Sequence, residues 1–128
     1  MGNTISIGAL SPKRDLTFVA DTVNAFLLAA QAPKAVGEFI NIGTGRMWSV
    51  AEMIAHIAKI LGRPIHAQSK SERQRPKHSE VYRLLCDARK AKRLLGWSAK
   101  MSFDDGLRQT IDWMRTHQDY RRPHVYHV

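Results

Sequence analysis

Basic side chains from two separate parts of the sequence are the strongest candidates for chemistry. The polar stretch 69–79 (SKSERQRPKHS) contains Arg73, Arg75 and Lys77, and Arg14 precedes an apolar run far upstream. Guanidinium groups match phosphate oxygens two at a time, so these residues could converge on a pyrophosphate. From residue chemistry alone, the more ordinary interpretation of 69–79 is a solvated charged loop, and that of Arg14 is a salt bridge with Asp15.

Other chemistry-bearing residues form no recognisable motif. Residues 43–45 (GTG) lead into a helix and could form a phosphate nest, but the GxGxxG spacing and a Walker lysine are lacking, so a plain turn is expected. His124 and His127 are close together, yet no zinc-like pattern includes the single cysteine, Cys86, which is expected to be an inert thiol. We therefore predict no catalytic residue and no metal site.

One stretch in the middle of the chain predicts a strand, a glycine turn and an amphipathic helix. Residues 38–42 (EFINI) are apolar and β-favouring, which is typical of a short strand. Ser49 and Glu52 have the spacing of a capping box, and apolar residues then recur at helical spacing over 50–61. Gly62 is expected to end that helix.

Shorter segments complete the predicted order of elements. Further strands are expected at 3–7, 16–19, 64–67 and 80–86, and further helices at 22–31, at 88–95 and from 103 onward. The predicted N-caps of these helices are Asp21, Asp87 and Ser102. The strand at 64–67 should lie parallel to 38–42, because a helix joins the two.

These elements predict an α/β protein with too few strands for a complete sheet. Residues 38–42 are apolar without alternation, which is typical of a strand that is covered on both faces. The chain offers few partners for such a strand, so the pattern indicates a piece of a larger fold.

Composition narrows the class of partner without choosing one. The 128 residues carry a formal charge of +9 and are 44% hydrophobic, which suits a folded domain with an anionic partner: nucleic acid, acidic lipid or a phosphorylated small molecule. No run approaches the ~18 apolar residues of a membrane helix, and no signal peptide is visible. A single cysteine fits a reducing cytoplasm.

Four segments together resemble a known family. They are RDLTFVADTVNAFLLA, GEFINIGTGRMWSVAEMI, RPKHSEVYRLLCDARKAKRLLGW and SFDDGLRQTIDWM, in this order. They are similar to the C-terminal part of extended short-chain dehydrogenase/reductases, the NAD-dependent nucleotide-sugar epimerases and dehydratases. The resemblance covers about residues 5–114 and looks closest to the 4,6-dehydratases of the legionaminic-acid type.

The resemblance implies a mixed α/β substrate-binding region, over 3–118, followed by a tail at 119–128. One or two of its parallel strands would normally complete a Rossmann sheet. Family members carry a GxxGxxG fingerprint and a YxxxK pair, and this chain has neither. The resemblance therefore implies that NAD and the catalytic residues belong to a missing N-terminal half, that this chain needs no cofactor and is inactive alone, and that the full enzyme is cytoplasmic.

Three residues match family positions that contact a nucleotide-diphosphate sugar. The resemblance assigns Arg14, of the RD motif, and Arg75 to the diphosphate, and Glu80 to the nucleoside. It gives Asn41 a structural role. Two alternatives from other classes stay open: a small basic nucleic-acid-binding domain, against which the absence of a recognition motif argues, and a module that dimerises through an exposed strand edge.

Overall fold

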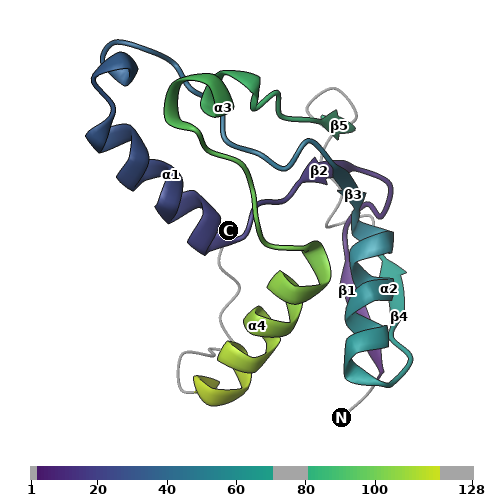
Figure 1. Ribbon diagram of the computed structural model, residues 1–128. Coiled ribbons are helices and arrows are strands. Elements are labelled where there is room, and N and C mark those ends of the chain that lie inside the picture. Colours follow the sequence, from purple (N-terminus) through teal and green to yellow (C-terminus); the bar gives the residue numbers. More distant parts are fainter. Residues whose placement is uncertain (1–2, 71–80, 119–128) are drawn as a thin grey trace.

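The computed structural model describes residues 3–70 and 81–118 (Figure 1). The elements in chain order are β1 (Thr4–Ile7), β2 (Lys13–Asp15), α1 (Val19–Gln31), the 3-10 turn η1 (Pro33–Ala35), β3 (Met47–Ser49), α2 (Val50–Leu61), β4 (His66–Ser69), β5 (Arg83–Leu84), α3 (Arg89–Leu95) and α4 (Phe103–Thr116). The predicted site residues Arg75 and Glu80 and the predicted tail lie outside the described residues.

The strands form two small sheets. β1 and β4 pair in parallel, and β2 lies between β3, antiparallel to it, and β5, parallel to it. In Figure 1, α1 and α3 occupy the upper left, the strands and α2 the right, and α4 the lower centre. The predicted strands at 3–7 and 80–86 are confirmed as β1 and the two-residue β5.

Helix α2 begins and ends as its local sequence predicts. The Ser49 side chain accepts the Glu52 backbone N–H at 3.1 Å, while the Glu52 carboxylate accepts the Ser49 N–H at 2.7 Å. This capping box satisfies two backbone donors that the first helical turn would leave unpaired. Gly62 adopts the left-handed conformation, with φ of 65°, and ends the helix.

The predicted strand at 38–42 is wrong as a strand. Ile40 and Ile42 pack against the core, whereas Phe39 is 93% exposed and Asn41 is also exposed. Within the described part of the chain, no backbone hydrogen bond joins 39–42 to another segment. A strand requires a pairing partner, and the expected one, β4, pairs with β1 instead.

The second predicted strand, 16–19, is also wrong, because pairing ends earlier. β2 stops at Asp15, and α1 begins at Val19 with Phe18 in the N-cap position. Asp21 therefore lies inside the first turn and is not the cap. It is buried, and its carboxylate accepts the backbone N–H groups of Lys100 and Met101 at 3.1 and 2.9 Å.

Of the predicted termini of α3 and α4, the N-cap of α4 and the C-terminal glycine of α3 are confirmed, and the N-cap of α3 is corrected. Ser102 caps α4 by accepting the Asp105 N–H at 3.1 Å, and Gly96 ends α3 in the left-handed conformation. The N-cap position of α3 is Ala88, not Asp87. The Asp87 carboxylate instead accepts hydrogen bonds from the backbone N–H and the guanidinium of Arg89. These bonds occupy the oxygens that an N-cap would offer to the helix.

The core is small and lies between α1 and α3. Ala25, Ala91 and Trp97 are buried there, and the Trp97 Nε1–H donates to the Asp21 carbonyl at 2.9 Å. Outside this core, α1 leaves Val23, Phe26 and Leu27 more than half exposed. Within the described residues, none of the helices has both the length and the apolar character that a membrane crossing requires.

Candidate functional site

The Asp15 carboxylate organises the glycine turn that precedes β3. Its Oδ1 accepts the Thr44 N–H at 2.8 Å and the Thr44 hydroxyl at 2.5 Å, and its Oδ2 accepts the Gly45 N–H at 2.8 Å. The Cys86 N–H adds a longer bond to Oδ2, at 3.3 Å. One side chain thus joins β2, the turn and the segment after β5.

The hydrogen bonds of the glycine turn do not suit a phosphate nest. The backbone N–H groups that would face a phosphate already donate to a carboxylate, which also places a negative charge there. The described residues therefore do not fit the pyrophosphate of a dinucleotide at this turn. This agrees with the lack of a GxxGxxG fingerprint in the sequence.

Cys86, next to this turn, is a half-buried free thiol. Burial raises its pKa, and the negative charges of Asp15 and Asp87 raise it further. The thiol is therefore protonated at neutral pH, whereas a nucleophile would be a thiolate.

Arg14 lies at the centre of the three-stranded sheet. It stands opposite Trp48 of β3 and Leu84 of β5, and its guanidinium donates to the Lys13 carbonyl at 2.9 Å. Successive residues of a strand point to opposite faces, so Arg14 and Asp15 serve opposite sides of the sheet. The two residues of the RD dipeptide therefore have different roles. Asp15 holds the glycine turn, and Arg14, on the other face of the sheet, is the ligand-binding candidate.

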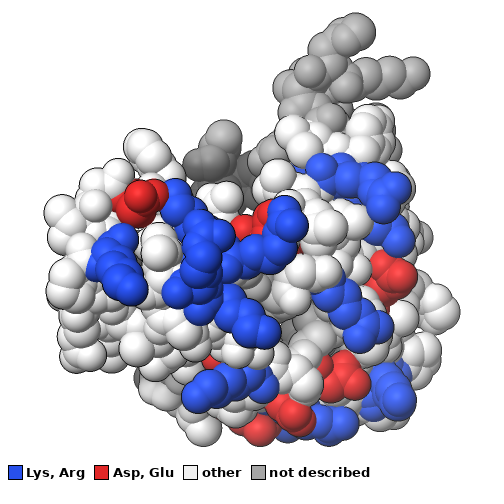
Figure 2. Space-filling model, turned by 45° about the horizontal axis from the view of Figure 1, so that its top comes forward, with Lys and Arg blue, Asp and Glu red and all other residues white. Residues whose placement is uncertain are grey.

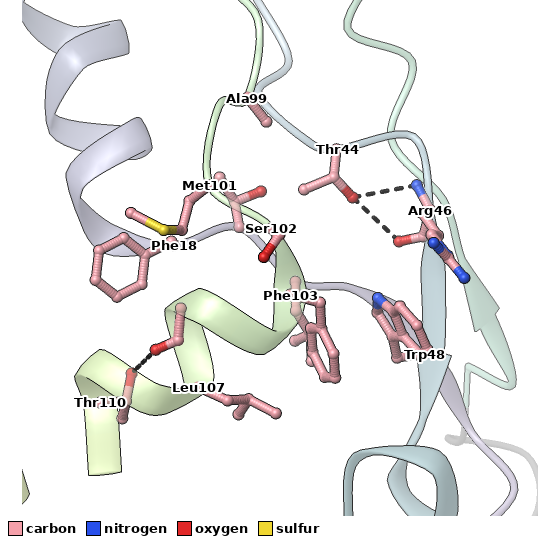
Figure 3. Close-up of a pocket in the computed structure, with 13 residues that line it drawn as sticks. Phe18, Thr44, Arg46, Trp48, Ala99, Met101, Ser102, Phe103, Leu107 and Thr110 are labelled. Atoms are coloured by element: carbon pink, nitrogen blue, oxygen red, sulfur yellow. Dashed lines mark hydrogen bonds between the residues drawn. The ribbon is translucent and has the colours of Figure 1, made fainter. Parts of the chain in front are cut away.

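A cavity of about 370 Å³ lies beside this sheet, between β3, the Leu16–Phe18 linker and the start of α4 (Figure 3). Its walls are mainly apolar, with Phe18, Met101, Phe103 and Leu107 among them. Arg46, Trp48 and Thr44 line the side next to the glycine turn, as Figure 3 shows. Arg14 does not line this cavity.

An aromatic cluster holds one wall of the cavity in place. The Trp48 and Phe103 rings are stacked, with centroids 4.4 Å apart and planes 13° from parallel. The His56 ring meets both edge-on, and its Nδ1 lies 2.5 Å from Asp104 Oδ1. Helix α2, which carries His56, and helix α4, which carries Phe103 and Asp104, are thereby joined to each other and to β3.

A second hollow lies beside α3 and is lined by Asn41, Asp87, Arg89, Lys90 and Arg93. Figure 2 shows Lys and Arg gathered on the face where α3 lies, and α3 has four basic residues among seven. Two of them are paired: Lys90 with Glu38, and Arg89 with Asp87. The hydrogen bond from Arg89 lowers the pKa of Asp87 to about 2, and Lys90 lowers that of Glu38, so both carboxylates stay charged and offset part of the basic charge.

Of the predicted site residues, Arg14 is the one that lies within the described part of the chain. The structure places it on β2, whereas Arg75 and Glu80 lie outside the described residues, so their meeting with Arg14 remains a prediction. Arg46 and Trp48 were not predicted as site residues, because they belong to no motif. Their i, i+2 spacing next to a short strand was the available signal, since it places both on one face. Among the described residues, no cluster of histidine, cysteine and carboxylate groups could hold a metal ion.

Comparison with known proteins gives a consistent set of relatives. Residues 1–110 match the family model described as GDP-mannose 4,6 dehydratase. A putative UDP-glucose 4-epimerase of Methanocaldococcus jannaschii is 31% identical over 111 residues, which cover 87% of this chain and 34% of that protein. A dTDP-glucose 4,6-dehydratase of Xanthomonas campestris is 32% identical over 115 residues, covering 84% and 32% respectively.

A solved structure agrees with these relatives. The UDP-glucuronic acid 4-epimerase of Bacillus cereus, in complex with UDP-glucuronic acid and NAD, superposes with a TM-score of 0.75 at 30% identity, covering 88% of this chain and 35% of that one. The predicted mixed α/β fold with parallel strands is thereby confirmed. The chain spans about a third of the length of the curated relatives that it matches.

Proposed function

Because this chain belongs to the GDP-mannose 4,6-dehydratase family of nucleotide-sugar epimerases and dehydratases, we propose that it is the substrate-binding part of such an enzyme. The observation that carries the proposal is the match over residues 1–110, which includes the RD dipeptide of β2. The ligand is a nucleotide-diphosphate sugar. In this proposal NAD and the hydride chemistry belong to a separate dinucleotide-binding part, and this chain is not catalytic alone; the occupied N–H groups of the glycine turn support this division.

Arg14 is the proposed diphosphate contact within the described residues. A diphosphate needs fixed cations, and Arg14 is fixed by a strand that is paired on both sides. Arg75 is the second proposed phosphate contact and Glu80 the proposed nucleoside contact. A substrate held at its diphosphate presents the sugar in a defined place, which is the contribution of a binding part to a reaction that occurs elsewhere.

We expect Arg14→Ala to weaken the binding of UDP-glucose, GDP-mannose or dTDP-glucose, whichever binds, by about tenfold, because one charge-assisted pair is lost. Isothermal titration calorimetry measures this change. Arg83→Ala is the matched control, since Arg83 is an exposed arginine on the neighbouring strand β5. Equal affinity of Arg14→Ala and the unchanged chain would remove the assigned role of Arg14.

We also propose that a separate dinucleotide-binding part docks on this chain at residues 38–42. Residues 39–42 have no backbone partner in the described chain, and Phe39 is 93% exposed. Phe26 and Leu27 of α1 add 73% and 58% exposed side chains. An unpaired segment suits strand addition by another domain, which would supply backbone bonds, and the exposed apolar side chains of α1 suit burial against such a partner.

Co-expression with the dinucleotide-binding part of the Bacillus cereus epimerase tests this docking. We expect the two parts to co-purify and the amide protons of 39–42 to become protected from hydrogen exchange. Phe39→Glu should reduce co-purification, whereas Trp113→Glu, on α4, should not. Protection of 39–42 in this chain alone, with dimers in solution, would instead identify a second copy as the occupant and contradict the proposal.

A further inference from the structure

We propose that the cavity beside Arg46 and Trp48 is a second ligand site, which accepts a planar aromatic ring carrying an anionic group. This goes beyond the proposed function, because it requires neither the diphosphate contacts nor the dinucleotide-binding part. The ring would enter the apolar interior, and the anionic group would meet the Arg46 guanidinium at the surface.

The cavity has the size and lining of a small-molecule site. Its volume of about 370 Å³ falls within the range of roughly 300–1,000 Å³ that is usual for ligand pockets. Phe18, Met101 and Leu107 offer apolar walls, and the stacked Trp48 and Phe103 rings offer an aromatic one (Figure 3). An aromatic ring suits these walls because it packs against other rings face to edge or offset.

Arg46 supplies a positioned cation at the edge of the cavity. Its guanidinium carbon lies 4.3 Å from the centre of the Trp48 ring, where the ring face attracts a cation. Arg46 is exposed, and within the described residues no carboxylate forms an ion pair with it. A guanidinium carries a planar fork of N–H donors that can bind a carboxylate or phosphate bidentately.

The backbone that carries Arg46 is itself held by Asp15 through the glycine turn. The Thr44 hydroxyl donates to Asp15 and accepts the Arg46 N–H at 3.1 Å, and it lies 3.2 Å from the Arg46 carbonyl. Two of these contacts are drawn in Figure 3. The cation, the indole and the turn are therefore ordered before any ligand arrives, which lowers the entropy cost of binding.

The chemistry of the walls selects for a ring and an anion together. A bare phosphate would meet one cation and a mainly apolar surface, which gives it no reason to leave water. A neutral ring would fill the cavity without using Arg46. Phenyl phosphate carries both features and is the smallest suitable probe, with inorganic phosphate and phenol as its separated halves.

Tryptophan fluorescence of the full chain tests the proposal. In a Trp113→Phe background the remaining indoles are the buried Trp97, 1% exposed, and Trp48, so quenching reports on the cavity. We expect saturable quenching by phenyl phosphate, with phosphate and phenol binding at least tenfold more weakly. Arg46→Gln should raise the Kd about tenfold, and Arg46→Lys should fall between, because it keeps the charge but loses the planar fork of N–H donors.

Two controls separate this site from the diphosphate contact. Arg83→Gln should leave the phenyl phosphate Kd unchanged, and Arg14→Ala, at a residue that stands opposite Trp48 in the sheet, should raise it by less than Arg46→Gln does. Leu107→Phe narrows the cavity and leaves Arg46 unchanged, and it should also weaken binding. It therefore tests the cavity by a route that does not depend on whether the Arg46 variants fold normally. Circular dichroism checks that each variant is folded.

Three results would overturn the proposal. They are quenching that does not saturate, binding by phosphate alone as tight as by phenyl phosphate, and an Arg14→Ala loss as large as that of Arg46→Gln. The last result would place the probe at the diphosphate contact. Failure here leaves the nucleotide-sugar proposal intact, because that one is tested by calorimetry with sugar nucleotides and Arg14→Ala.

Discussion

Trp97→Ala is expected to lower the free energy of unfolding by about 4 kcal/mol, the largest effect predicted for any single substitution in this chain. Trp97 is 1% exposed and packs with Ala25 of α1 and Ala91 of α3. Truncation would leave a cavity where these helices meet and would remove the Nε1–H that donates to the Asp21 carbonyl. Because domains of this size are stable by about 5–15 kcal/mol, such a loss brings the chain close to unfolding.

Urea denaturation followed by circular dichroism measures this effect without relying on the removed indole. Trp113→Ala is the matched control, since Trp113 is 54% exposed on α4 and stacks on His117. We expect the control to change stability by about 0.5 kcal/mol. Similar losses for both variants would show that the α1–α3 core does not dominate the stability of the chain.

Gly43→Ala is expected to destabilise the chain by about 3 kcal/mol, through overpacking of the glycine turn. A Cβ at this position would lie 2.2 Å from the Cys86 Cβ, 2.7 Å from its Sγ and 2.9 Å from Asp15 Oδ2. Real atoms do not approach so closely, so the turn or the Asp15 carboxylate would have to move. Movement of Asp15 would also loosen Thr44, which holds the backbone of Arg46.

Gly45→Ala is the control for Gly43→Ala in the same turn. Gly45 has φ of +74°, and a Cβ added there would meet nothing within 4 Å, so backbone strain alone should cost about 1 kcal/mol. Adding Cys86→Gly to Gly43→Ala removes the nearest contact and should recover part of the loss in a double-mutant cycle. Strictly additive effects of the two substitutions would contradict the proposed collision.

The elements that the sequence predicted correctly depend on contacts between near neighbours. Ser49 and Glu52 cap α2, Ser102 caps α4, and Gly62 and Gly96 end their helices as expected. Each signal operates within about one helical turn, so local sequence contains all that is needed. The family resemblance was likewise readable from ordered segments.

Strands were harder to predict, because their pairing is not local. β1 and β4 lie far apart in the chain yet pair in register from Thr4 with His66 onward. Residues 38–42 have the composition of a strand, but they form none in the described structure, since composition does not supply a partner. The same reasoning explains why β2 stops at Asp15, where its bonds to β3 end.

By itself, the sequence determined the family, the mixed α/β class and the caps that depend on adjacent residues. Only the tertiary structure decided the roles of two aspartates: Asp21 accepts N–H groups from the approach to α4, and Asp15 holds the glycine turn. The cavity beside Arg46 also arises from segments distant in the sequence. A carboxylate binds whichever donors folding brings within about 3 Å, and those donors are set by chain packing over long separations, which local spacing does not encode.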